Sequence, residues 1–148
     1  MPSLVTERIE SVKSGIVGAG AFAIAELVFF LLRAIAVSSL PQLNLASSLL
    51  DWEVLIQLAI GAVSGFLFGV TYRYIIRDDR NSHLNDGAVL AFGLVRGLAL
   101  IETNLASNLL FAESISIVFL VVQSIVGFAI ARLVLDLAIQ QKFIKPFV

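Results

Sequence analysis

The chain has 148 residues, of which 59% are hydrophobic and only 14% are charged, and its net charge is −1. Soluble domains have about 25% charged residues, and so short a chain cannot bury this much apolar surface in an aqueous core. The composition therefore excludes a soluble domain and predicts an integral membrane protein. The lack of cysteine excludes disulfides and cysteine-bound metals, and the near-neutral charge gives no reason to expect nucleic acid as a partner.

Residues 2–14 form the first predicted element. Leu4, Val5, Ile9 and Val12 recur at helical spacing among charged residues. This pattern predicts a short amphipathic helix that lies at the membrane interface and leads into the first span. A cleaved signal peptide would need a basic segment before its apolar run. Glu7 and Glu10 stand where that segment should be, so we expect the first span to be retained.

The first predicted span covers about residues 15–37. Its first half is rich in glycine and alanine, which allow a neighbouring backbone to approach closely, and its second half is bulky. Glu26 lies at its centre and Arg33 near its far end. Ionisable residues inside a membrane are costly, so each needs a partner or a polar cavity.

The second predicted span covers about residues 53–76. Gly61, Gly65 and Gly69 recur in it every four residues, a spacing that predicts a smooth face for close helix packing. At its exit Arg73 stands between two tyrosines. That arrangement is typical of a cation that snorkels to the interface beside aromatic rings.

Residues 77–85 are the most hydrophilic stretch of the chain. Their ionisable side chains are Arg77, Asp78, Asp79, Arg80 and His83. They are typical of a solvated turn, and the alternative is a docking loop for a partner. Because the turn is short, we expect the second and third spans to form a tight antiparallel hairpin.

The third predicted span covers about residues 87–105. It carries a second pair of small residues, Gly93 and Gly97, with Arg96 beside them and Glu102 near the far end. The glycine pair again predicts close packing against another helix. A guanidinium at this depth costs at least about 2.5 kcal/mol unless it is paired.

The fourth predicted span covers about residues 114–137 and contains Gln123. Near its end, Arg132 and Asp136 are one helical turn apart and are able to pair. With four spans, both termini and the 77–85 turn share one side, which carries eight of the ten basic residues. By the positive-inside rule, both termini face the cytoplasm or the equivalent stroma.

Glu26 and Arg96 lie at the same depth, because the first and third spans run in the same direction. We therefore predict that they form an ion pair, to which Gln123 supplies further hydrogen bonds. Arg33 and Glu102 are a second candidate pair with poorer geometry, since the two helix faces do not stay aligned over that distance. The first pair is either a structural ion pair or part of a proton or ion path, and contact with a partner subunit, a lipid or a pigment is a third alternative.

The spans also hint at an internal repeat. The offset from Glu26 to Arg96 carries Phe22 onto Phe92, and Phe66 in the second span corresponds to Phe128 in the fourth. Such matches also arise by chance in a composition this biased.

The sequence contains none of the residue sets that carry common chemistry. It has no Ser-His-Asp set, no zinc-protease motif and no glycine loop suited to phosphate. The glycines lie inside the spans, where helix packing explains them. We therefore predict no enzyme and no cofactor, while a bound lipid or pigment stays open.

The stretch TYRYIIRDDRNSHLNDGAVLAFGLVRGLALIE, residues 71–102, carries a resemblance. In the run TYRY, the polar turn and AFGLVRGLA it resembles a group of small, poorly characterised thylakoid membrane proteins of cyanobacteria and chloroplasts. The resemblance implies a place in the photosynthetic membrane, as an accessory subunit or assembly factor of a large complex. It transfers no functional residue.

The sequence thus predicts an all-α membrane protein, in which residues 1–148 form a single domain. Its expected architecture is a bundle of four transmembrane helices, built as two hairpins, with a short N-terminal amphipathic helix. Its expected function is to bind other integral membrane proteins in a cyanobacterial thylakoid or plasma membrane, as an accessory subunit or an assembly or stability factor. The alternative is a small oligomeric transporter or channel that uses Glu26 and Arg96.

Overall fold

The computed structural model describes residues 4–37, 51–76, 82–105 and 114–145. Within these ranges each helix contains a stretch long and apolar enough to cross a membrane. The described chain is therefore all-α, and its architecture is that of an integral membrane protein. Its four helices are α1 (Leu4–Val37), α3 (Trp52–Ile75), α4 (Ser82–Leu105) and α5 (Ser114–Gln140).

The predicted separate amphipathic helix is not present, and this prediction was wrong. Its residues form the first turns of α1, which continues without a break for 34 residues, because no proline interrupts the chain there. The helical spacing of these residues is confirmed, since they are helical. Leu4 and Val5 are exposed at 81% and 65%, whereas Ser11 and Ser14 are buried. The apolar side of these turns therefore faces outward and the polar side packs against the protein.

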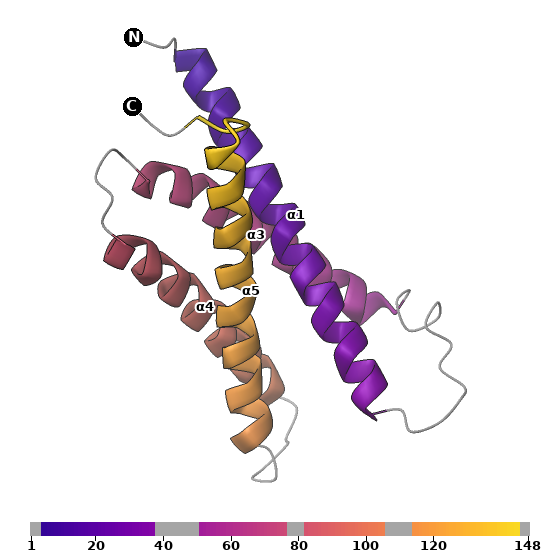
Figure 1. The fold of residues 1–148 in the computed structure, drawn as a ribbon. Helices are drawn as coiled ribbons and strands as arrows, with labels where there is room; N and C mark the ends of the chain where they lie inside the picture. Colours follow the sequence, from indigo (N-terminus) through magenta and orange to yellow (C-terminus); the bar gives the residue numbers. More distant parts are fainter. Residues whose placement is uncertain (1–3, 38–50, 77–81, 106–113, 146–148) are drawn as a thin grey trace.

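The helices form two antiparallel pairs (Figure 1). In one pair α1 packs along α3, and in the other α4 packs along α5; the two pairs are joined mainly where α1 meets α5. We call them the α1–α3 pair and the α4–α5 pair. Both termini lie at the same end of the molecule, and the two pairs diverge toward the opposite end (Figure 1).

The glycines predicted in the second span form the contact between α1 and α3. A Cβ atom built on Gly65 would lie 2.6 Å from the carbonyl oxygen of Gly18 and 2.7 Å from Cβ of Phe22. The Ser14 hydroxyl donates to the carbonyl oxygen of Gly69 at 2.6 Å. No side chain fits between these two backbones, which is why the face must be glycine.

The second glycine pair serves α4 and α5 in the same way. A Cβ atom on Gly93 would lie 2.8 Å from Cα of Ile125, and one on Gly97 would lie 2.9 Å from Cα of Val121. Each helix pair therefore uses its own glycine face internally.

The predicted tight hairpin of α3 and α4 does not form. These two helices pack over a short stretch and then separate (Figure 1). The reason lies in the glycine faces: that of α3 is turned to α1 and that of α4 to α5, so larger side chains lie between α3 and α4 and hold their backbones apart.

The core is an aromatic cluster to which each helix contributes one phenylalanine: Phe22, Phe68, Phe92 and Phe128. Their ring centroids lie between 4.3 and 5.7 Å apart in the pairs that touch, distances at which aromatic pairs add about 0.5–1.5 kcal/mol beyond burial. Phe22 and Phe92, which the possible internal repeat matched to each other, both belong to this cluster. Phe68 pairs with Phe128, whereas Phe66, which the repeat had matched to it, packs on Gly15.

Candidate functional site: a charge pair between the two helix pairs

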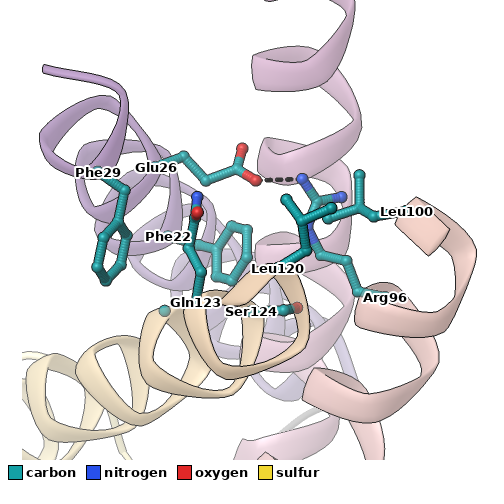
Figure 2. Close-up of a pocket in the computed structure, with 9 residues that line it drawn as sticks. Phe22, Glu26, Phe29, Arg96, Leu100, Leu120, Gln123 and Ser124 are labelled. Carbon is teal, nitrogen blue, oxygen red and sulfur yellow. Dashed lines mark hydrogen bonds and ion pairs between the residues drawn. The ribbon is translucent and has the colours of Figure 1, made fainter. Parts of the chain in front are cut away.

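Glu26 of α1 and Arg96 of α4 are brought together as an ion pair, in which Nη2 of Arg96 donates to Oε1 of Glu26. Figure 2 shows the two side chains extended toward each other from their helices. In the described residues the backbones of α1 and α4 do not approach each other closely at any point. The bond between the two helices is therefore made by the ends of two long side chains.

The surroundings explain how the pair is accommodated. The Arg96 and Glu26 side chains are only 8% and 16% exposed. The guanidinium carbon of Arg96 lies 5.1 Å from the ring centroid of Phe22, within the range of a cation–π contact. On the other side, the Glu26 carboxylate occupies the space above Gly61, where any Cβ atom would overlap it. The carboxylate fits here because the residue at position 61 is a glycine and has no side chain.

A small cavity lies beside the pair, in the angle between α1, α4 and α5. Gln123 and Ser124 of α5 line it together with Glu26 and Arg96 (Figure 2). In the described part of the chain Gln123 makes no hydrogen bond to Glu26 or Arg96. The hydrogen bonds predicted from its amide to the ion pair are therefore not present, although the residue lies beside the pair. Three buried polar atoms have no protein partner there: Oε2 of Glu26, Nε of Arg96 and Oγ of Ser124.

The other predicted site residues are not brought to this place. Arg33 and Glu102 are both exposed, and no ion pair joins them among the described side chains. Arg77, Asp78, Asp79 and Arg80 of the candidate docking loop lie outside the described residues. His83 is exposed in the first turn of α4.

A second polar centre, which the sequence did not predict, surrounds Arg73 at the end that carries both termini. Its side chain is fully buried rather than snorkelling. Nη2 donates to Oε2 of Glu7 at 2.5 Å and Nη1 to Oγ of Ser11 at 2.6 Å. Nε donates to the carbonyl oxygen of Lys145 at 2.9 Å. Arg73 therefore ties α3 to the start of α1 and to the segment that follows α5.

That segment turns back onto the bundle. Lys142 adopts a left-handed φ of 60°, and the amide of Phe143 donates to the carbonyl oxygen of Ala138, the kind of bond that closes a helix C-terminus. Ile144 is then fully buried. The amide of Lys145 donates to Oε2 of Glu10 at 3.0 Å, so both polar groups of the Lys145 backbone are held by side chains of other helices.

A neighbouring group joins α3, α4 and α5. The Tyr72 hydroxyl donates to Oδ1 of Asp136 at 2.7 Å. Arg132 pairs with Asp86 of α4 and, at 3.7 Å, with Asp136 one turn along α5. The predicted pairing of Arg132 with Asp136 is therefore part of a larger set of contacts.

The sequence offered one usable sign of these contacts. Glu7, Ser11 and Ser14 follow one another at helical spacing, so they occupy one face of α1. The spacing alone does not show what this face meets, because inside a membrane protein a polar face is as readily turned toward a buried cation as toward water.

The described residues show no group of three or more histidine, cysteine, aspartate or glutamate side chains that could hold a metal ion. The polar contacts between helices in the described part of the chain are ion pairs and hydrogen bonds. Comparison with protein-family models, with curated proteins and with solved structures gave no match. The resemblance of residues 71–102 to thylakoid membrane proteins therefore stays a prediction.

Proposed function

We propose that this chain is a non-catalytic integral membrane protein that binds other membrane proteins, as an accessory subunit or an assembly or stability factor. The observation that carries this proposal is the use of the central charges. Glu26 of α1 and Arg96 of α4 form an ion pair with each other. They join the two helix pairs and leave the chain's outer surface for its partners.

That outer surface is broad and apolar. Large side chains point away from the bundle on every helix, and examples are Ile24, Val63, Val95 and Leu133, exposed at 64%, 60%, 71% and 62%. Lipid covers such a surface in isolation, and helices of another membrane protein pack on it equally well, through van der Waals contact. The chain has little extramembrane surface in its described part with which to act otherwise.

The transporter alternative needs a polar path from one side of the membrane to the other. The aromatic cluster around Phe68 and Phe128 lies between the central charge pair and the polar contacts of Arg73 and Tyr72. The cluster interrupts any polar path between the two places, which weighs against an ion path.

The proposed location is a photosynthetic membrane, thylakoid or plasma membrane of a cyanobacterium, with both termini on the cytoplasmic side. The resemblance of residues 71–102 supports the membrane. The positive-inside rule supports the orientation, and it agrees with the finding that both termini lie at one end (Figure 1).

Co-purification in a mild detergent tests the proposal. We expect the chain to bring down a defined larger complex. Tryptophan substitutions at Ile24, Val63, Val95 and Leu133, one on each helix, should leave the fold intact, and at least one should release the complex. A chain that purifies alone or only with copies of itself contradicts the proposal.

The transporter alternative is tested in proteoliposomes. It predicts a proton or ion flux that changes in Glu26→Gln. If the unaltered protein carries no flux, the alternative is excluded.

A further inference from the structure

A groove of about 360 Å³ lies between α4 and α5. Its volume falls within the range of about 300–1,000 Å³ that is usual for small-molecule sites. Four of the side chains that line it are apolar: Val89, Leu90, Ala129 and Leu133. Leu90 and Leu133 are 49% and 62% exposed, so the groove opens outward to the membrane rather than into the bundle.

The other two lining residues, Asp86 and Arg132, form an ion pair at one end of the groove. Asp86 lies ten residues before Arg96 on α4, and Arg132 lies eight residues after Ser124, which lines the cavity beside the central charge pair. These separations are about 15 Å and about 12 Å along the helices, and half of the hydrocarbon core is about 15 Å thick. With the central pair at mid-membrane, this polar end lies at the headgroup boundary.

The apolar part of the groove lies deeper than its polar end. Val89 and Leu90 follow Asp86 by about one turn toward mid-membrane, and Ala129 precedes Arg132 by about one turn on α5. The groove therefore has the polarity profile of a lipid, with a polar headgroup at the boundary and acyl chain next to it. A transmembrane helix of a partner is apolar along its whole span and offers no complement to the ion pair.

The local charges indicate which headgroup fits. Arg132 also lies 3.7 Å from the carboxylate of Asp136, so among these three side chains one guanidinium faces two carboxylates. A phosphate or sulfonate headgroup would add another negative charge to a group whose sum is already −1, which is repulsive. Sugar hydroxyls add no charge, and they both donate and accept hydrogen bonds. The Asp86 and Arg132 side chains are 57% and 23% exposed, so both are accessible to such a headgroup.

We propose that this groove binds one lipid with a neutral sugar headgroup. One acyl chain lies along Val89, Leu90 and Ala129. The sugar hydroxyls donate to the carboxylate of Asp86 and accept from the guanidinium of Arg132. The inference goes beyond the binding of partner proteins and does not depend on it.

Native mass spectrometry of the unaltered chain in detergent tests the site. The probes are a monoglycosyl diacylglycerol, phosphatidylglycerol and phosphatidylcholine with the same acyl chains. We expect one glycolipid to be retained at a concentration about tenfold lower than either phospholipid, since hydrogen bonds to charged groups discriminate by that much or more. Equal retention of the three lipids, preference for a phospholipid, or no retained lipid would overturn the proposal. The isolated chain is used, so the result is independent of whether a larger complex co-purifies.

A substitution that fills the groove locates the bound lipid. Leu90→Trp places a bulky ring in the groove and should abolish the preferential retention of the glycolipid. The control is Leu98→Trp, because Leu98 of the same helix is 59% exposed and does not line the groove. Retention of the glycolipid by Leu90→Trp as strong as by Leu98→Trp would contradict the site.

A change of charge tests the headgroup. Asp86→Asn removes one of the two carboxylates near Arg132, so the preference for glycolipid over phosphatidylglycerol should fall toward parity. Asp51→Asn is the control, since this exposed carboxylate stands at the start of α3 and outside the groove. An unchanged preference in Asp86→Asn would refute the assignment of the headgroup.

Discussion

Gly61 of α3 lies against the carboxylate of Glu26, so close that a Cβ atom at position 61 would overlap Oε2. The ion pair between α1 and α4 thus depends on a residue of a third helix that contributes no side chain. The glycine faces and the buried charges, which look like separate features in the sequence, meet at this point.

Gly61→Ala should therefore weaken the Glu26–Arg96 pair by displacing the carboxylate. We expect a loss of stability of about 1–3 kcal/mol, as is usual for overpacking a tight site, measured by thermal melting in detergent. Gly20→Ala is the matched control, because nothing lies within 4 Å of a Cβ atom there. That change should be neutral or stabilising by up to about 1 kcal/mol through helix propensity. Equal effects at the two positions would contradict the close contact.

A double-mutant cycle should show that Glu26 and Arg96 are coupled. Arg96→Leu leaves a carboxylate unpaired inside the bundle, and removing one partner of a buried pair costs roughly 3–5 kcal/mol. Adding Glu26→Gln removes the unpaired charge and should restore part of the lost stability and protein level. If the two effects simply add, the pair contributes no interaction of its own.

Arg73→Lys should destabilise the protein although the charge is kept. A lysine ammonium cannot reach Glu7, Ser11 and the Lys145 carbonyl together in the way that the planar guanidinium does. We expect a loss of about 2 kcal/mol or more, measured by unfolding in increasing denaturant. The control is Arg33→Lys on an exposed position, which should change stability by about 0.5 kcal/mol at most.

The segment after α5 should contribute to stability through one residue. Ile144 is fully buried whereas its neighbour Phe143 is 62% exposed. Ile144→Ala should therefore cost about 2–5 kcal/mol, and Phe143→Ala much less. Protease digestion should release the end of the chain faster in Ile144→Ala than in Phe143→Ala. The reverse order would mean that the segment does not pack as described.

The absence of native cysteine makes the orientation easy to test by labelling. Lys142 and Asp51 are exposed at opposite ends of their helices. In intact cells or oriented vesicles, Lys142→Cys should react with an impermeant thiol reagent only from the cytoplasmic side, and Asp51→Cys only from the other side. Reaction of both from the same side would contradict four spans, and the opposite pattern would reverse the predicted orientation.

The sequence predicted the features that follow from depth and spacing. Glu26 and Arg96 lie at the same depth because their spans run in the same direction. Two opposite charges at one depth in a membrane are expected to pair, since each is costly there without a partner. The glycine spacing of α3 and of α4 predicted close packing, though not which neighbour each face would meet.

The features that depend on long-range geometry could not be predicted. Arg73 is held by the start of α1 and by the backbone of Lys145, and nothing near position 73 in the sequence signals either contact. The central phenylalanine of α3 is Phe68 rather than Phe66, because the register of two helices depends on their crossing angle as well as on their sequences.

The hydrogen bond from Arg73 to Lys145 also constrains how the protein is made. The two residues are 72 positions apart, so the ribosome has delivered α1 and α3 to the membrane long before the carbonyl that Arg73 needs exists. The α1–α3 pair, which closes through glycine and serine contacts of its own, is able to assemble during translation. Its buried arginine finds Glu7 and Ser11 of α1 at that stage, and it gains its last partner, the Lys145 carbonyl, only after α5 and the turn at Lys142 have followed.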